Sequence, residues 1–144
     1  MTVKRILDQK PQQGVETISG QETLGDAAAM LAAKKIGALI VGDGGHGVAG
    51  ILSERDIVNR IAAEGAAALS KPVSTAMTRT VVVAALHETA VSVLQRMTEG
   101  RFRHMPVMEE GRLIGVISIG DVVKARITEV EQENRAMEDM IKGF

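Results

Sequence analysis

The chain has 144 residues, of which 45% are hydrophobic and 24% charged, a composition typical of one globular domain or two small ones. Seventeen Lys and Arg residues against eighteen Asp and Glu residues give a formal charge of −1, without the basic excess that nucleic-acid binding needs. The absence of cysteine excludes disulfides, thiolate metal sites and thiol catalysis, and no apolar run approaches the roughly 18 residues of a membrane helix.

The first half of the chain shows the pattern of a small α+β unit. Its predicted elements, in order, are an N-terminal helical segment 1–14, an extended piece 16–19, a helix 22–35, strands 38–41 and 48–52, and a helix 54–67. The two strands flank a glycine-rich turn, which is a hairpin pattern. Gly37, shortly after the first long helix, is interpreted as its stop signal.

The second half follows the same order. After a linker with Pro72, the predicted elements are an extended piece 80–84, a helix 88–99, strands 104–108 and 113–118, and a helix 120–142. Gly100 is the corresponding helix stop. The apolar runs of the strands are nearly continuous, which predicts strands buried on both faces. The expected divisions are a first repeat 15–69, a linker 70–79, a second repeat 80–127 and a helical extension 128–144.

The two halves are related by duplication. Gly50, Ser53, Asp56 and Val58 recur 65 residues later as Gly115, Ser118, Asp121 and Val123. Upstream, Glu22 and Thr23 recur 66 residues later, as does Val41, and the single residue of slippage falls in a turn. Similarity through a helix, a strand and a hairpin, with the length change confined to a turn, is typical of repeated units.

A serine followed three residues later by an aspartate stands at each predicted strand-to-helix junction: Ser53 with Asp56, and Ser118 with Asp121. One interpretation is a capping box, in which the hydroxyl accepts from a first-turn amide and the carboxylate reaches back. The other is a ligand site, because amides at a helix start bind phosphate and a carboxylate suits the vicinal hydroxyls of a ribose. The duplication of the pair after a buried strand favours a ribose-phosphate site.

These motifs resemble those of a known family. The segments GILSERD (50–56), GVISIGD (115–121), RFRHMPVM (101–108) and AMTRTVVVA (76–84) are similar to the tandem cystathionine β-synthase-type (CBS) domain pair, or Bateman module, of the stand-alone bacterial type. The likeness implies an α+β fold of two βαββα repeats packed through their sheets as one module, with an N-terminal helix and a long C-terminal helix. It also implies clefts between the repeats that bind adenosyl ligands such as AMP, ATP or NAD(H).

The resemblance assigns roles to the paired residues and to their neighbours. It implies that Asp56 and Asp121 hold ribose hydroxyls and that the two serines contact phosphate. Arg103 and His104 stand before a buried strand, where the family often carries a basic residue for phosphate, whereas the matching positions 37 and 38 carry no charge. We therefore expect unequal clefts, with the more anionic ligand in the one lined by Arg103 and His104.

Other residues complete the expected site. Arg55 is either a phosphate ligand or an exposed first-turn residue, and Gly120 leaves space over its helix start for a larger group. Aliphatic side chains are expected to sandwich the adenine, because the chain has only two phenylalanines and no other aromatic ring besides histidine. The candidates for this contact are Ile18, Val82, Val83 and Met105. The expected ligand-binding set is Ile18, Gly37, Ala38, Ser53, Glu54, Arg55, Asp56, Thr80, Val82, Val83, Arg103, His104, Met105, Pro106, Ser118, Gly120 and Asp121, with no catalytic residue and no metal ligand.

The predicted last helix carries an apolar stripe: Val123, Ile127, Val130, Met137 and Ile141, with Asn134 at the remaining heptad position. A stripe with this spacing is typical of a short coiled-coil seam, in which a polar residue often sets the register. The alternative is packing on the N-terminal helix, whose Val3, Ile6 and Leu7 need a partner. We expect packing inside the chain together with a share in a homodimer, which the family resemblance also implies.

The function expected from these features is non-enzymatic regulation and signal transduction. The protein would bind an adenine nucleotide, signal through changed packing in the homodimer and act on an unknown protein in trans, in the cytoplasm and without a nucleic-acid or membrane partner. No catalytic cofactor is expected. A structural dimerisation module without ligand stays open, as does a nucleotide-processing enzyme, although the sequence has no Walker loop, metal-ligand cluster or cysteine nucleophile.

Overall fold

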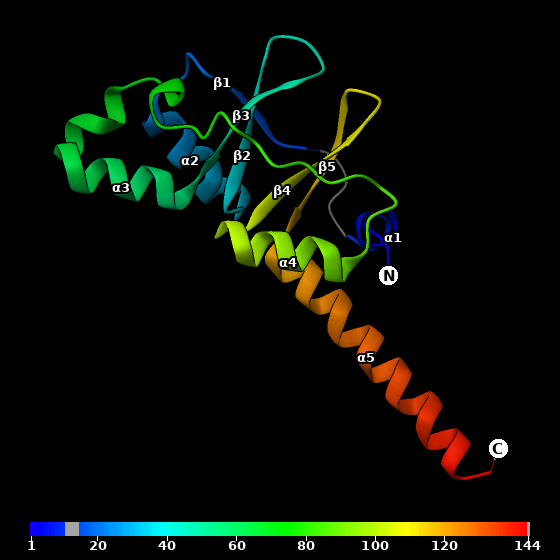
Figure 1. Ribbon diagram of the computed structural model, residues 1–144. Coiled ribbons are helices and arrows are strands. Elements are labelled where there is room, and N and C mark those ends of the chain that lie inside the picture. The colour runs from blue at the N-terminus through cyan, green and yellow to red at the C-terminus, as the bar shows by residue number, and fades with distance from the viewer. Residues whose placement is uncertain (11–14, 144) are drawn as a thin grey trace. The chain divides into compact units, whose positions relative to one another are not determined.

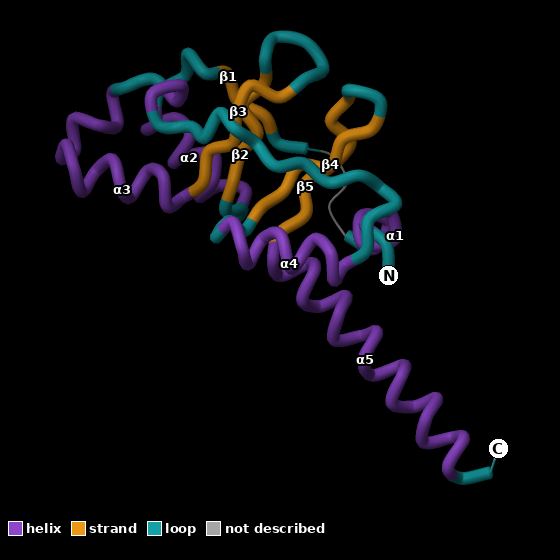
Figure 2. Tube along the Cα trace, viewed as in Figure 1, coloured by secondary structure: helices purple, strands orange, loops and turns teal. Residues whose placement is uncertain are grey.

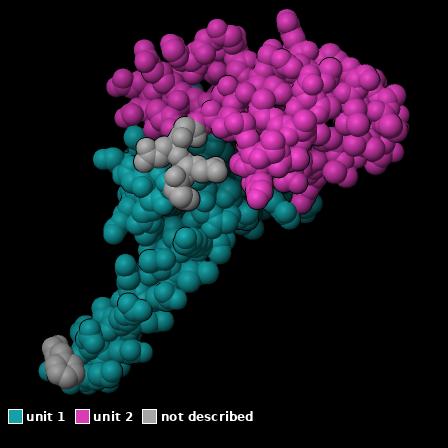
Figure 3. All heavy atoms as spheres, turned by 180° about the vertical axis from the view of Figure 1, so that it is seen from behind, with its two compact units in different colours: residues 1–13, 83–108, 115–144 teal, residues 14–82, 109–114 magenta. Residues whose placement is uncertain are grey.

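Figure 1 shows the computed structural model of the chain, in which residues 1–10 and 15–143 are described. Its helices, strands and loops are distinguished in Figure 2. The chain divides into two compact units (Figure 3): unit 1 comprises residues 1–13, 83–108 and 115–144, and unit 2 comprises residues 14–82 and 109–114. Residues 11–14 of the predicted N-terminal segment lie outside the described residues.

Unit 2 contains the first repeat. Its elements are β1 (Thr17–Ser19), α2 (Leu24–Lys34), β2 (Ala38–Gly42), β3 (Val48–Ser53) and α3 (Glu54–Glu64), followed by 3-10 turns at Gly65–Ser70 and Val73–Thr75. The sheet has the order β1-β2-β3, with β1 parallel to β2 and β2 antiparallel to β3. Its core is aliphatic and consists of Ile18, Leu24, Ala27, Leu31, Leu39, Val41, Leu52, Ile57 and Val73. Because Val73 belongs to the predicted linker, that segment is part of the core of this unit.

Unit 1 contains most of the second repeat and both helical ends of the chain, whereas residues 109–114, at the turn between its two strands, are grouped with unit 2. Its elements are α1 (Val3–Gln9), α4 (Ala90–Gly100), β4 (His104–Glu109), β5 (Arg112–Ser118) and α5 (Ile119–Ile141), and β4 pairs with β5. Its buried core consists of Val3, Ile6, Ala84, Ala90, Val93, Met97, Met105, Val107, Ile117, Val122 and Ala125. The N-terminal helix therefore supplies two residues to the core of the second repeat.

The backbone pairing follows the sequence repeat. Ile18 pairs with Val41 where β1 runs parallel to β2, and Ala84 pairs with Val107 in a parallel bridge 66 residues later. The predicted extended piece 80–84 is reduced to this single bridge. The Ala84 amide and carbonyl bond to the two neighbours of Val107, at 2.9 and 3.0 Å.

The prediction that Gly37 and Gly100 stop the two helices is wrong. Lys35 and Arg101 turn the chain instead, with φ of 54° and 57°, in the left-handed region. This conformation costs a residue with a Cβ about 1–2 kcal/mol, and the amide of each cap residue offsets part of the cost by donating to a carbonyl of the last helical turn. Gly100 lies inside α4, where a side chain would collide with the Phe102 ring.

Burial of the strands agrees with the prediction for half of them. The middle residues of β2 and β4 are buried three in a row, as expected for strands covered on both faces. Burial along β3 and β5 alternates instead, so the prediction is wrong for these two strands. One face of each is only partly covered, and the chain continues from each of these strands directly into a helix.

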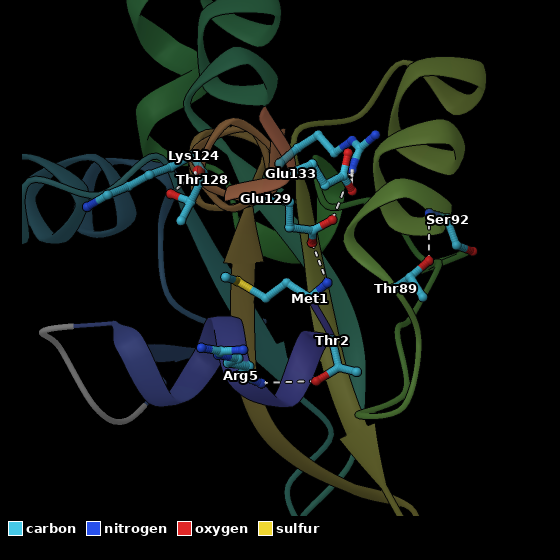
Figure 4. A network of polar contacts seen from close by, with 10 residues as sticks. Met1, Thr2, Arg5, Thr89, Ser92, Lys124, Thr128, Glu129 and Glu133 are labelled. Carbon is cyan, nitrogen blue, oxygen red and sulfur yellow. Dashed lines mark hydrogen bonds and ion pairs between the residues drawn. The ribbon is translucent and has the colours of Figure 1, made fainter. Parts of the chain in front are cut away.

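The long helix α5 packs on its unit through a different face from the predicted stripe. Val122 and Ala125 are buried, whereas the stripe residues are exposed: Val123, Ile127, Val130, Met137 and Ile141. Packing of the stripe on the N-terminal helix is therefore a wrong prediction. The terminal ammonium of Met1 forms an ion pair with Glu129, which ties the chain's N-terminus to α5 (Figure 4). Residues 131–143 are all exposed, and no helix among the described residues has the length and apolarity to cross a membrane.

Candidate functional site

The first candidate position is the turn from β3 into α3, here called the Ser53 junction. The Ser53 amide donates to Asp56 Oδ2 at 2.8 Å, and the Asp56 amide donates to Ser53 Oγ at 3.3 Å. Ser53 has an extended backbone, with φ of −107° and ψ of 162°, as expected of a residue that caps a helix. This geometry places the hydroxyl and the carboxylate together at the beginning of α3.

The turn from β5 into α5, here called the Ser118 junction, repeats this arrangement. The Ser118 amide donates to Asp121 Oδ2 at 2.8 Å, and the Asp121 amide donates to Ser118 Oγ at 3.1 Å. A third capping box, Thr23 with Asp26, begins α2. The capping interpretation is therefore confirmed, and a capping box alone does not distinguish a ligand site from an ordinary helix start.

Two features set the Ser53 and Ser118 junctions apart from the third box. Each follows the last strand of its repeat, and Asp56 and Asp121 are half-buried whereas Asp26 is exposed. The capping bonds use one oxygen of each carboxylate. Because an ionised carboxylate offers about four lone-pair positions, both can accept further hydrogen bonds from a ligand.

A backbone hydrogen bond joins each junction to the residue just before the first strand of its hairpin, β2 or β4. The Glu54 amide donates to the Gly37 carbonyl at 3.0 Å, and the Ile119 amide donates to the Arg103 carbonyl at 2.8 Å. These bonds bring together residues that the sequence placed in matching positions. Gly37 thus lies beside the Ser53 junction and Arg103 beside the Ser118 junction, so only the latter has a basic residue at this place.

The Ser118 junction also contains a residue that sequence reasoning missed. Lys10, at the end of α1, places its Nζ 2.9 Å from Asp121 Oδ2 and 2.8 Å from the Val116 carbonyl. No sequence signal indicated this contact, because Val116 lies 106 positions along the chain. Among the residues that the structure describes, Asp56 forms no ion pair, so the two junctions differ in charge.

The surroundings of Asp121 shift its acidity. Burial raises the pKa of the Asp121 carboxyl, but the Ser118 amide and the Lys10 ammonium outweigh burial and hold the pKa below its ordinary value. Both partners favour the charged form, because they donate to the carboxylate. Asp121 is therefore an anion at neutral pH, as a hydrogen-bond acceptor for ribose hydroxyls needs to be.

Another segment of the chain packs on the strand before each junction: the predicted linker on β3, and α1 on β5. At β3, the Ile51 amide and carbonyl bond to Thr78 at 3.0 and 2.9 Å. At β5, a Cβ on Gly115 would lie 2.7 Å from Leu7 Cδ2, so α1 packs directly on that strand. Gly50 and Gly115, which recur in the sequence, are therefore positions of close approach rather than of special backbone conformation.

The structure distributes the other predicted site residues over both units. Unit 2 contains Ile18, Gly37, Ala38, Ser53, Glu54, Arg55, Asp56, Thr80 and Val82, and unit 1 contains Val83, Arg103, His104, Met105, Pro106, Ser118, Gly120 and Asp121. Of the four residues predicted to sandwich adenine, Ile18 and Met105 are 6% and 0% exposed and belong to the cores. Val82 and Val83 are 38% and 41% exposed and lie outside the cores.

A second group missed by sequence reasoning lies next to Val83. Arg96 Nη2 donates to both carboxylate oxygens of Glu88, at 2.7 and 2.6 Å, and Arg96 Nη1 donates to the Val83 carbonyl at 3.0 Å. Glu88 also accepts from the Ala85 amide at 2.8 Å. These bonds fasten the extended segment that contains Val83 to α4. No group of three or more His, Asp or Glu side chains in the described part of the chain is arranged to hold a metal ion.

The sequence and the fold match those of known proteins. The family model of the CBS domain matches residues 3–63 and 73–128. The CBS-domain containing protein ATU1752 from Agrobacterium tumefaciens is 49% identical and superposes with a TM-score of 0.84, covering 88% of this chain and 99% of that one. The first curated relatives are CBS domain-containing proteins from Arabidopsis thaliana, 32% identical over 88% of this chain, which itself spans only 24% of their length.

Two more distant structures contain ligands. The CBS domain pair of protein MJ0100, in complex with 5′-methylthioadenosine and S-adenosyl-L-methionine, has a TM-score of 0.78 at 23% identity, over 90% of this chain and 98% of that one. The CBS domain protein PAE2072 from Pyrobaculum aerophilum, complexed with AMP, has a TM-score of 0.74 at 21% identity, over 84% and 89%. At these identities the likeness shows a shared fold.

Proposed function

The chain belongs to the CBS-domain family, and we propose that it is a regulatory protein that binds adenine nucleotides without catalysing a reaction. The proposed binding positions are the Ser53 and Ser118 junctions. The observation that carries the proposal is that a half-buried carboxylate and a hydroxyl stand together at a helix start in each repeat. The ligands of the two distant structures, AMP in one and two adenosyl compounds in the other, support an adenosine-containing ligand.

The ribose is proposed to bind the two aspartates. Its vicinal hydroxyls donate to Asp56 or Asp121, whose capping bonds occupy only one oxygen each. The repeated pair at the end of β3 and of β5 supports this assignment. The exposed side chains of Val82 and Val83 are proposed as the aliphatic contacts of the adenine, in agreement with the near absence of aromatic residues from the chain.

The phosphate is proposed to bind the helix starts. The first amide of α3 is bonded to the Gly37 carbonyl and the third to Ser53, which leaves the second amide, that of Arg55, as a donor for a phosphate oxygen. Gly120 has the same position in α5. The serine hydroxyls accept the capping bond and keep a proton to donate.

Signalling is proposed to run through a homodimer. The ligand would favour one of two packing arrangements by its differential affinity for them. The exposed apolar stripe of α5, defined above by Val123, Ile127, Val130, Met137 and Ile141, supports pairing with a second copy of the chain. The proposal includes the cytoplasmic location expected from the sequence, a regulated protein in trans, and AMP, ATP or NAD(H) as the nucleotide.

Calorimetric titration tests the proposal. AMP, ATP, NAD⁺ and NADH are titrated into protein from which co-purifying nucleotide has been removed. We expect binding that Asp56→Ala and Asp121→Ala each weaken about tenfold or more at their own junction, because a charged acceptor of the ribose is lost. Asp26→Ala is the matched control, since it removes the same capping carboxylate from an exposed helix start.

The outcomes separate the alternatives. Equal dissociation constants for all three variants and the wild type would show that these carboxylates only cap their helices. A nucleotide present at 100 times its dissociation constant should stabilise the protein by roughly 2.7 kcal/mol, and the absence of any thermal shift would favour a structural dimerisation module. Turnover of bound nucleotide that His104→Ala abolishes would favour an enzyme.

A further inference from the structure

We propose that Lys10 selects the charge class of the ligand at the Ser118 junction, favouring phosphate-bearing adenosine ligands and disfavouring adenosyl sulfonium ligands. The inference rests on the proposed function, which assigns an adenosine ligand to this position. It concerns the residue that caps the end of α1, outside the strand-to-helix turn that carries the serine and the aspartate. The Ser53 junction has no corresponding ion pair among the described residues and provides the internal comparison.

The position of the Lys10 ammonium is determined by several contacts. The Lys10 amide caps α1 by donating to the Leu7 carbonyl at 3.1 Å, and Leu7 itself packs on Gly115 of β5. From there the side chain reaches both the Val116 carbonyl and Asp121 Oδ2, at 2.8 and 2.9 Å. Only 27% of the Lys10 side chain is exposed. The ammonium is therefore a preorganised charge and not a freely moving surface group.

Lys10 leaves the carboxylate able to bind a ribose. The ammonium and the Ser118 amide both use Oδ2 of Asp121. The other oxygen retains its lone pairs for ribose hydroxyls, because an ionised carboxylate can accept several hydrogen bonds at once. A ligand can thus enter without displacing Lys10, and the ammonium then remains next to the bound sugar.

The charge balance differs between the two junctions. At the Ser118 junction, Lys10 neutralises Asp121, the first two helical residues are Ile119 and Gly120, and Arg103 lies beside the turn. At the Ser53 junction, Glu54 and Asp56 outnumber Arg55. A phosphate brings negative charge and is attracted by the first arrangement, whereas a sulfonium brings positive charge and is repelled by it.

The size of the effect follows from the distance. The 5′ substituent of a ribose held by Asp121 lies within roughly 8 Å of the ammonium, where a unit charge changes affinity on the order of tenfold at the dielectric of a partly buried site. The affinity for a ligand with a neutral 5′ substituent should hardly depend on this charge. The comparison of anionic, neutral and cationic ligands therefore separates the effect of the Lys10 charge from the effect of its packing.

The experiment uses AMP, 5′-methylthioadenosine and S-adenosylmethionine as the anionic, neutral and cationic probes. Each is titrated calorimetrically into Asp56→Ala protein, in which binding at the Ser53 junction is weakened and the Ser118 junction dominates the titration, with Lys10 intact or replaced. We expect Lys10→Met to weaken AMP about tenfold, to change methylthioadenosine less than twofold and to strengthen S-adenosylmethionine. Lys10→Arg should retain the wild-type order of affinities for the three probes. Lys4→Met, which removes an exposed lysine of α1, should change none of these affinities.

Each outcome decides between the two proposals. If the protein with Lys10 intact binds neither the three probes nor ATP, NAD⁺ or NADH, the proposed function fails, and the inference fails with it. If it binds one of these nucleotides but none of the three probes, the inference alone fails. If it binds the probes but Lys10→Met weakens AMP and methylthioadenosine by the same factor, Lys10 only positions Asp121 and the charge selection is refuted. Unchanged affinities refute it as well. Lys10→Gln, which keeps a donor for the Val116 carbonyl, replaces Lys10→Met if that variant does not fold.

Discussion

Lys10 and Asp121 join the end of α1 to the start of α5, with 2.9 Å between the ammonium and Oδ2. Asp121 thereby takes part in one contact within its own helix start and one contact with a distant part of the chain. It caps its own helix through the Ser118 amide, which is a local contact, and it binds a cation from the other end of the chain. Within the described part of the chain, Asp56 makes only the local contact, so the duplicated turns are not equivalent in the folded protein.

The ion pair predicts an acid-sensitive contribution to stability. Because the folded pKa of Asp121 is lowered, its contribution is fully present above the ordinary pKa of 3.8 and is lost as the pH falls through the lower folded value. Urea titrations between about pH 2 and pH 7 should show a stability difference between wild type and Asp121→Asn that is constant above about pH 5 and shrinks below about pH 4. Asp8→Asn, which changes an exposed carboxylate of α1, serves as the control. A difference independent of pH would contradict the prediction.

Gly50 should tolerate a methyl group poorly. A Cβ there would lie 2.8 Å from both the Met77 sulfur and the Thr78 carbonyl oxygen, and the latter belongs to backbone that is itself hydrogen-bonded to β3. We expect Gly50→Ala to lower the free energy of unfolding by about 1–3 kcal/mol. Gly115→Ala should cost less, because the end of the flexible Leu7 side chain faces it. Gly42→Ala, with open space around the new methyl group, should stay within about 0.5 kcal/mol of wild type.

Glu88 should matter more for stability than its partial exposure indicates. It joins Arg96 to the Ala85 amide, and loss of the carboxylate leaves both donors without their partner. We expect Glu88→Ala to destabilise unit 1 by about 1–3 kcal/mol in denaturant unfolding. Glu99→Ala, which removes an exposed carboxylate of α4, is the control and should change little. In a double-mutant cycle, additive effects of Glu88→Ala and Arg96→Met would show that the pair is not coupled.

The stripe of α5 predicts a dimer that a single charge disrupts. Met137 is 62% exposed in the middle of the distal part of the helix, and a carboxylate buried against a second copy lacks a partner there. Light scattering coupled to gel filtration should give the mass of two 15.3 kDa chains for the wild type and of one chain for Met137→Asp. Ala136→Asp, one position away on another face of α5, should remain dimeric. A wild-type protein with the mass of one chain would remove the basis for signalling through a dimer.

The sequence by itself determined the features that depend on neighbouring residues. A capping box needs a hydroxyl and a carboxylate three positions apart, so Ser53 with Asp56 and Ser118 with Asp121 could be recognised from spacing alone. The duplication likewise predicted that Gly37 and Arg103 occupy matching places, and each of their carbonyls accepts from the first amide of the following helix. The ligand roles of these residues stay predictions, because a capping box looks the same with and without a ligand.

Errors arose where local signals were compatible with more than one structure. Glycines near the helix ends predicted stops at Gly37 and Gly100, but Lys35 and Arg101 adopt the left-handed conformation, which hydrogen bonds to the last helical turn offset. The apolar stripe of α5 was correctly placed on one face of a helix, and its spacing carried no information about which neighbour covers it. The core buries Val122, adjacent to that stripe, together with Ala125.

Only the tertiary structure decided which distant groups meet. Lys10 lies against Val116 from 106 positions away, and no periodicity or motif relates the two, because a contact between an ammonium and a carbonyl needs only closeness in space. The pairing of Glu88 with Arg96 depends in the same way on how the segment before α4 folds back on that helix. Sequence patterns predict interactions between residues that are close along the chain. The charges around a side chain depend instead on which segments pack against it in the folded protein.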